Sequence, residues 1–322
     1  MVFFPGYGFE MKHLIHCFAA LSFFAAPCAC SSGENTLPDN DAYDDSAGAD
    51  IDAGFDIPVE PDAYDPITEP VLDIPLDTPP DTPAIPCEPS CPAMDWVAIP
   101  AGSFMMGSSS GDTWEAPVHS VNVPAFEITR IEITLAQFRA CHDSGYCWEP
   151  STAAGAGCTW GTAGRDNHPI NCMTWDDADN FCKWVGGRLP SEAEWEFAAR
   201  GEEGREYPWG NEAASCSYAI MNEGGTASCG GEYTWPVCSK PAGNTPQGLC
   251  DMAGNVWEWV HDLWHDDYTG APADGSAWDS PGLSGVIRGG DFDTDAYQVR
   301  ATYRYAAYSS HGYIDMGFRC AR

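Results

Sequence analysis

The sequence predicts an α+β domain with little regular secondary structure, and three observations support this class. A few short segments carry helix-capping residues and apolar residues at helical spacing, and they lie among short β-prone runs. Long stretches rich in Gly, Pro, Asn and Trp separate these segments. The chain also has 15 cysteines in 322 residues, which suggests that disulfides hold its loops in place.

The β-prone runs come first in the globular part. Apolar and polar residues alternate well enough in 96–106 to predict a strand, and the small residues 107–111 predict a turn after it. Two further β-prone runs lie within 119–133, on either side of Pro124. After residue 202 the sequence predicts loops and short strands.

Three helices are predicted from their capping signals. In the second and third, an acidic residue three positions after the N-cap completes a capping box. Glycines at 186–187 and at 201 predict where these two helices end. The expected N-caps are Thr134, Thr174 and Ser191, for helices over 135–142, 175–185 and 192–200.

The N-terminus, residues 1–30, is typical of an export segment. A short basic start precedes an apolar run, and small residues with two cysteines follow it. This pattern resembles a bacterial lipoprotein signal, with Cys28 or Cys30 as the lipidated residue; a plain secretory signal is the alternative. The apolar run is too short for a comfortable membrane span. We therefore expect an exported protein of the cell envelope, attached to a membrane only through a lipid.

An acidic tether and a short hinge precede the globular domain. Residues 31–86 are rich in Asp and Pro and lack Lys and Arg, so they cannot bury enough apolar surface to fold. Residues 87–94 form the expected hinge, and 95–322 the domain. The net charge of the chain is −34, which argues against nucleic acid as a partner and is compatible with divalent cations.

Twelve cysteines follow residue 86, and this even number is consistent with six disulfides. Zinc sites are not expected because no Cys-x-x-Cys motif occurs. Connectivity does not follow from sequence. The pairs we consider from spacing alone are Cys87–Cys91, Cys141–Cys147, Cys158–Cys172, Cys216–Cys229 and Cys238–Cys250.

Four motifs follow one another in a characteristic order: Gly187–Gly201, Asp251–Trp259, Arg288–Gly290 and Gly317–Cys320. Together they resemble the formylglycine-generating enzyme, or sulfatase-modifying factor, family over residues 96–322. The resemblance implies a variant of the C-type lectin fold and a disulfide between Cys182 and Cys320.

The resemblance also implies a structural Ca²⁺ in the second motif. Its ligands would be the side chains of Asp251 and Glu258 and the backbone carbonyls of Gly254 and Val256. Oxygen ligands from an irregular loop suit this hard cation. The alternative is a turn before a buried, Trp-rich strand, with Glu258 paired to an arginine.

The catalytic part of the family pattern is missing. In the family, two cysteines five residues apart follow the Arg-Gly-Gly motif and bind copper as thiolates, which suit soft Cu(I). Here Asp291–Tyr305 contains no cysteine, and none occurs between Cys250 and Cys320. We therefore expect neither copper nor this catalytic pair, while the question of enzymatic activity stays open.

We expect instead a binding groove beside residues 291–305, which would take a peptide or a glycan on aromatic and charged side chains. Burial of about half of these rings in the core is the competing interpretation. Two alternative functions are an active oxidoreductase acting on a sulfatase-like partner and a structural surface protein. The candidate ligand-binding residues are Phe292, Asp293, Tyr297, Arg300, Tyr303 and Arg304.

Overall fold

The computed structural model describes residues 86–150, 157–279 and 282–322, which belong to one compact unit. The predicted export segment, with Cys28 and Cys30, and the tether up to residue 85 lie outside the described residues. Within the described residues, no helix is both long and apolar enough to cross a membrane.

Two antiparallel ribbons begin the domain. The strands are β1 (Trp96–Ile99) paired with β4 (Phe126–Thr129), and β2 (Gly102–Met106) paired with β3 (His119–Val123). The single strand predicted over 96–106 is thus two strands with different partners. Pro100 lies between them, and since proline has no N–H to donate, it interrupts the ladder.

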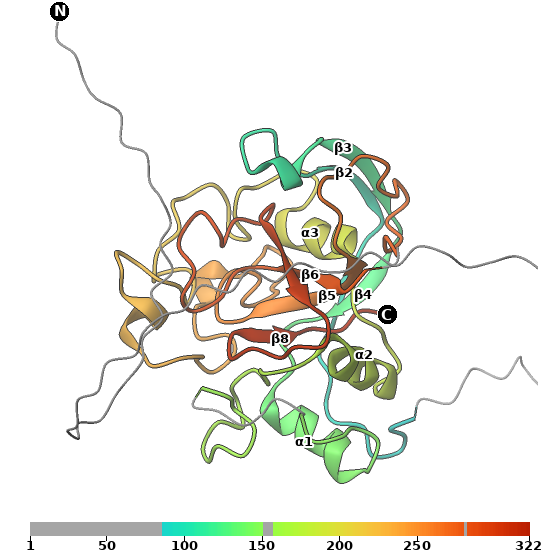
Figure 1. The fold of residues 1–322 in the computed structure, drawn as a ribbon, viewed down its shortest axis with the longest axis vertical. Helices are drawn as coiled ribbons and strands as arrows, with labels where there is room; N and C mark the ends of the chain where they lie inside the picture. Colours follow the sequence, from blue (N-terminus) through green and yellow to red (C-terminus); the bar gives the residue numbers. More distant parts are fainter. Residues whose placement is uncertain (1–85, 151–156, 280–281) are drawn as a thin grey trace, which may run out of the picture. The chain divides into compact units, whose positions relative to one another are not determined.

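A four-stranded sheet forms the second half of the domain, in the order β7-β6-β5-β8 (Figure 1). β8 runs parallel to β5, and the other neighbours are antiparallel. The strands are β5 (Trp257–Leu263), β6 (Ser284–Arg288), β7 (Arg304–Tyr308) and β8 (Met316–Phe318).

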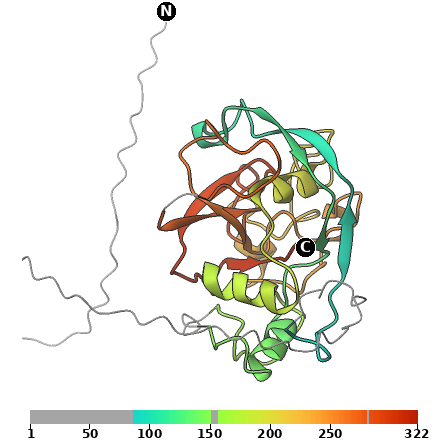
Figure 2. The ribbon, with the colours of Figure 1, turned by 90° about the vertical axis from the view of Figure 1, so that its right-hand side faces the viewer.

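All three predicted α-helices are confirmed, each with its capping box formed: α1 (Leu135–Asp143), α2 (Trp175–Trp184) and α3 (Glu192–Arg200). Short 3₁₀ turns cover Thr113–Glu115, Ala227–Gly230 and Pro241–Gly243. Figures 1 and 2 show α3 between the β2–β3 ribbon and the large sheet, and it contacts β2, β3, β5 and β6. Every residue from Glu192 to Ala199 is buried, so α3 is a central helix.

Buried ion pairs satisfy the acidic residues of this core. Glu192 on α3 pairs with Arg304 of β7, and Glu196 pairs with Arg288 of β6. The side chains of both arginines are fully buried. Because the partners come from distant parts of the chain, each pair fixes α3 against the large sheet.

Six disulfides account for all twelve cysteines of the described residues: Cys87–Cys91, Cys141–Cys147, Cys158–Cys172, Cys182–Cys320, Cys216–Cys229 and Cys238–Cys250. Cys182–Cys320, the pair implied by the family resemblance, links α2 to the segment after β8. Cys87 is buried, and its N–H donates to the Trp184 carbonyl, so the predicted hinge begins against α2.

Candidate functional site

Two adjoining cavities lie over the large sheet, where the Arg-Gly-Gly motif ends. One has a volume of about 490 Å³ and the other about 370 Å³, and they share Trp257, Tyr305 and Asp315. We call the two together the Trp257 groove. Its lining includes residues of all four strands, and the segment Asp291–Thr294 forms part of its wall.

A glycine turn brings Asp291 to this groove. Gly289 and Gly290 directly follow β6 with φ angles of +94° and +73°, which side chains other than glycine rarely adopt. A Cβ on Gly290 would also lie 2.8 Å from Val299 Cγ1. The turn therefore requires glycine, and it directs the chain from β6 so that Asp291 lines the groove.

Two carboxyl groups meet in the groove. Asp291 is only 3% exposed, and one of its oxygens accepts the N–H of Asp293. Burial raises the pKa of Asp291 to about 8, and the nearby charge of Asp315 and a hydrogen bond between the two carboxyls add to this shift. Asp315 Oδ1 is buried and has no hydrogen-bond partner. Asp291 therefore holds a proton near neutral pH.

Aromatic rings form much of the remaining lining. The rings of Trp257 and Tyr305 stack, with centroids 6.4 Å apart and planes inclined by 29°. Trp257 is nearly buried, whereas Tyr305 is 51% exposed. Tyr308 and Tyr313 are also exposed and line the larger cavity. The groove thus offers the rings of exposed tyrosines to solvent, with the buried Trp257 ring behind Tyr305.

The structure divides the six predicted ligand-binding residues among three places. Phe292 and Asp293 line the Trp257 groove, and Asn222 donates to the Asp293 carboxylate. Tyr297 and Arg300 line a separate cavity of about 330 Å³, in which Arg300 is paired with Glu115.

The other two predicted ligand-binding residues lie in the interior. Tyr303 is only 5% exposed, and Arg304 is buried and bonded to both oxygens of Glu192. The competing interpretation, buried rings and arginines paired with acids, describes these two residues. Neither lines the groove: the Tyr303 ring packs beneath it against Trp257, and Arg304 is held in its ion pair with Glu192.

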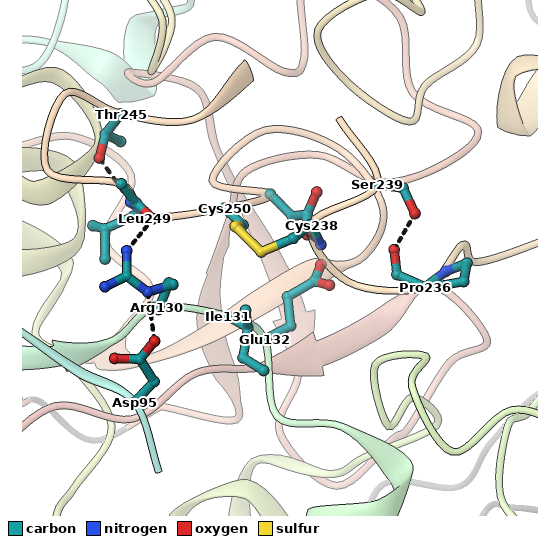
Figure 3. Close-up of a disulfide and its surroundings, with 12 residues drawn as sticks. Asp95, Arg130, Ile131, Glu132, Pro236, Cys238, Ser239, Thr245, Leu249 and Cys250 are labelled. Carbon is teal, nitrogen blue, oxygen red and sulfur yellow. Dashed lines mark hydrogen bonds and ion pairs between the residues drawn. A yellow bond between two sulfur atoms is a disulfide. The ribbon is translucent and has the colours of Figure 1, made fainter. Parts of the chain in front are cut away.

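The predicted calcium loop lies beside the Cys238–Cys250 disulfide. Figure 3 shows this disulfide with Arg130 and Glu132 near it, and the Cys250 N–H donates to the Arg130 carbonyl. The N–H of Cys238 donates to Asp251, so the disulfide and the first predicted ligand are directly connected.

The acidic residues around this loop outnumber their cations. Burial, and then the charges of Asp251 and Glu258, raise the pKa of Glu132 well above its usual range. Burial also raises the pKa of Asp251 to about 6. Among the described residues, Arg319 is the only cationic side chain whose charge lowers these two pKa values. This excess of buried carboxyl groups, which a bound cation would allow to ionise, fits a cation.

Glu258, by contrast, does not fit as a side-chain ligand. Arg319 donates to both of its oxygens, at 2.6 Å each, and Trp195 Nε1 donates to one of them. The alternative arrangement, Glu258 paired to an arginine, is therefore present. Among the described residues, no group of three or more His, Cys, Asp or Glu side chains is arranged to hold a metal ion. Asp251 and the carbonyls of Gly254 and Val256 are the remaining ligand candidates.

The residues present do not fit thiolate-bound copper. All twelve cysteines of the described part are in disulfides, and the segment 291–305 has none. Asp291, Phe292 and Asp293 line the groove where the motif order places the family's cysteine-bearing segment. Carboxylates are hard ligands and do not replace thiolates for Cu(I).

Residues 82–322 match the family described as the sulfatase-modifying factor enzyme 1-like domain. The chain belongs to this family. Its relatives include the formylglycine-generating enzyme of Streptomyces coelicolor, which is 34% identical over 70% of this chain and 88% of that protein. The inactive C-alpha-formylglycine-generating enzyme 2 of Bos taurus is 29% identical over 71% and 88%.

A solved structure of the same kind is PvdO from Pseudomonas aeruginosa. It is 34% identical to this chain, with a TM-score of 0.60, and the match covers 70% of this chain and 93% of PvdO. The family prediction from the four ordered motifs is thereby confirmed, together with a mixed helix-and-sheet domain stabilised by disulfides.

Sequence analysis did not identify Asp315 or Trp257 as groove residues. Trp257 lies in the predicted calcium motif, between Val256 and Glu258, for which a buried, Trp-rich strand was the alternative interpretation. Asp315 is 24 positions after Asp291 in the sequence and belongs to no recognised motif. The parallel pairing of β8 with β5 brings Asp315 to the groove, and the Trp257 N–H donates to its carbonyl.

Proposed function

We propose that this protein is an exported, envelope-associated binding module that takes a peptide or glycan segment in the Trp257 groove and lacks the copper-dependent oxidase activity of its family. The observation that carries the proposal is the composition of the groove. It offers aromatic faces and carboxyl groups, and no thiol, at the segment that follows the Arg-Gly-Gly motif.

Two further observations support the proposal. Aromatic walls with a few polar groups are typical of sites that bind small segments, and cavities of about 490 and 370 Å³ are within the usual range of roughly 300–1,000 Å³. Six disulfides favour an oxidising location outside the cytoplasm, in agreement with the predicted export segment. Lipidation at Cys28 or Cys30, and the C-type lectin variant of the fold, belong to the same proposal.

We also propose that Ca²⁺ has a structural role at Asp251 and the carbonyls of Gly254 and Val256. The excess of buried carboxyl groups around this loop supports a cation there. Calcium would supply positive charge and oxygen coordination to an irregular loop, which suits its chemistry.

The first experiment separates binding from oxidation. The full chain, oxidatively folded, is incubated with a Cys-x-Pro-x-Arg peptide, copper, calcium, oxygen and a reductant, and the peptide is analysed by mass spectrometry beside an active formylglycine-generating enzyme. We expect no formylglycine. Conversion of the peptide cysteine would refute the proposed loss of oxidase activity.

The second experiment tests the groove as a binding site. Peptide and glycan arrays are probed with the full chain and with Tyr305→Ala, which removes a half-exposed ring of the groove. The matched control is Tyr146→Ala, since Tyr146 is 43% exposed and lines neither cavity of the groove. Binding that Tyr305→Ala alone weakens is the expected result. Absence of any bound peptide or glycan would overturn the proposed function.

A further inference from the structure

The groove carries acidic side chains and no basic ones among its described residues. Its lining residues, all in the described part of the chain, include Asp291, Asp293 and Asp315 and no Lys, Arg or His. Several buried acids elsewhere have arginine partners: Glu115 pairs with Arg300, Glu192 with Arg304, and Glu258 with Arg319. The carboxyl groups of the groove are therefore not neutralised by a cation of the protein.

The carboxyl pair has unused capacity to accept hydrogen bonds. Asp291 is held by the Asp293 N–H and by the other carboxyl, whereas Asp315 Oδ1 is buried with no partner. Leaving a buried acceptor without a partner costs free energy that a bound donor would restore. A ligand that brings N–H donors and positive charge would satisfy this oxygen and replace the proton held by Asp291.

The ring faces favour the same kind of ligand. Trp257 and Tyr305 line the cavity that holds the carboxyl pair. Aromatic faces attract ammonium and guanidinium groups, and guanidinium also binds carboxylates in a planar, two-pronged geometry. The chain's net charge of −34 adds a long-range attraction for cations.

A metal ion does not fit this combination. No group of three or more His, Cys, Asp or Glu in the described part of the chain is arranged to hold one, and the rings of Trp257, Phe292 and Tyr305 form part of the wall around the pair. Rings supply no ligand atoms to a hard cation, which requires several oxygen atoms. The observations therefore point to an organic cation.

We infer that the Trp257 groove binds the cationic side chain of a peptide, a lysine ammonium or an arginine guanidinium, with Asp291 and Asp315 as its counter-charges and Trp257 and Tyr305 as its walls. This inference rests on the proposed function and names the ligand class of the same site.

The test uses fluorescein-labelled peptides and the full chain. Three pentapeptides, Gly-Gly-X-Gly-Gly, carry arginine, lysine or citrulline at X; citrulline keeps the shape of arginine without its charge. Fluorescence anisotropy measures Kd at fixed salt. We expect the arginine and lysine peptides to bind at least roughly tenfold more tightly than the citrulline peptide, since hydrogen bonds to charged groups are the strong ones.

Variants then place the binding in the groove. Asp315→Asn keeps the side-chain shape and should weaken the arginine peptide by roughly tenfold or more. Asp291→Asn should do the same, but its burial makes Asp315→Asn the safer variant for folding. The control is Asp143→Asn, an exposed acid at the end of α1 whose ion-pair contact is the adjacent His142. This control should leave the Kd of the arginine peptide unchanged. That result would exclude the protein's overall negative charge as the cause of binding.

Each contrary outcome is distinct. If the citrulline peptide binds as tightly as the arginine peptide, and Tyr305→Ala weakens both, the groove is a binding site but the cation inference is wrong. If the basic peptides bind equally to the wild type and to Asp315→Asn, the inference is also wrong. If no peptide or glycan binds at all, the proposed function itself fails.

Discussion

Replacement of Arg319 by methionine tests whether one buried arginine holds the acidic centre of the domain together. Arg319 is fully buried and donates to both oxygens of Glu258, and its remaining N–H groups donate to backbone carbonyls, that of Cys250 among them. Methionine keeps a long buried side chain but removes the charge. Glu258 would then be a buried carboxylate without a cation, close to Glu132 and Asp251.

The expected loss of unfolding free energy is large. Removing one partner of a buried ion pair costs about 3–5 kcal/mol, because the remaining charge stays buried and unpaired. At roughly 2–4 °C per kcal/mol for a domain of this size, Tm should fall by about 6–20 °C. Arg322→Met is the matched control: it breaks a pair of the same 2.6 Å length with Glu127, but both side chains are 39% exposed. Its cost should stay below about 1 kcal/mol.

Urea unfolding followed by tryptophan fluorescence, with disulfides intact, measures both variants. Trp195 is a suitable reporter because its indole N–H donates to Glu258. A loss below about 1 kcal/mol for Arg319→Met, or equal losses for the two variants, would refute the argument that the buried carboxyl groups depend on this arginine.

Three further predictions follow from the disulfides, the calcium loop and the groove. Replacing Cys182 and Cys320 together by alanine should cost about 2–5 kcal/mol in urea unfolding, since this bridge closes a long loop; an unchanged midpoint would contradict the assigned pair. Chelation of Ca²⁺ should lower the wild-type Tm by roughly 5–10 °C for a site saturated about 100-fold above its Kd, and should leave the Tm of Asp251→Ala unchanged; equal shifts would rule out this site. The arginine peptide should bind more tightly at pH 9 than at pH 6, because Asp291, whose pKa is raised to about 8, must lose its proton before its carboxylate can pair with a cation; a flat profile between these pH values would contradict Asp291 as a counter-charge. The other titratable groups that line the groove are Asp293, Tyr305, Tyr308 and Tyr313.

The helices were predictable because their signals are local. The N-caps Thr134, Thr174 and Ser191 lie within three positions of the residues that complete their capping boxes; the boxes at Thr174 and Ser191 form as the sequence indicated, and Gln137 adds one at Thr134. The disulfides between cysteines close in sequence could be considered for the same reason, because their spacing is a local signal. The break between β1 and β2 was not predicted, although Pro100 was a visible signal for it.

The carboxyl pair could not be predicted because it depends on tertiary structure. Asp291 is placed by the glycine turn after β6, and Asp315 by the approach of β8 to β5. Similarly, Glu192 and Glu196 on α3 resemble the polar face of a surface helix. They are buried because Arg288 and Arg304 arrive from distant strands, and no local pattern in the sequence encodes that meeting.

The Cys182–Cys320 bridge also imposes an order on biosynthesis. The other five bridges join cysteines 4 to 14 residues apart, so each can close soon after its segment is made. Cys182 must stay reduced, or be released from a wrong partner by thiol exchange, until a residue 138 positions later has been synthesised. Maturation of this domain should therefore be slow and depend on disulfide isomerisation, with the final covalent step coming after the closing strand is in place.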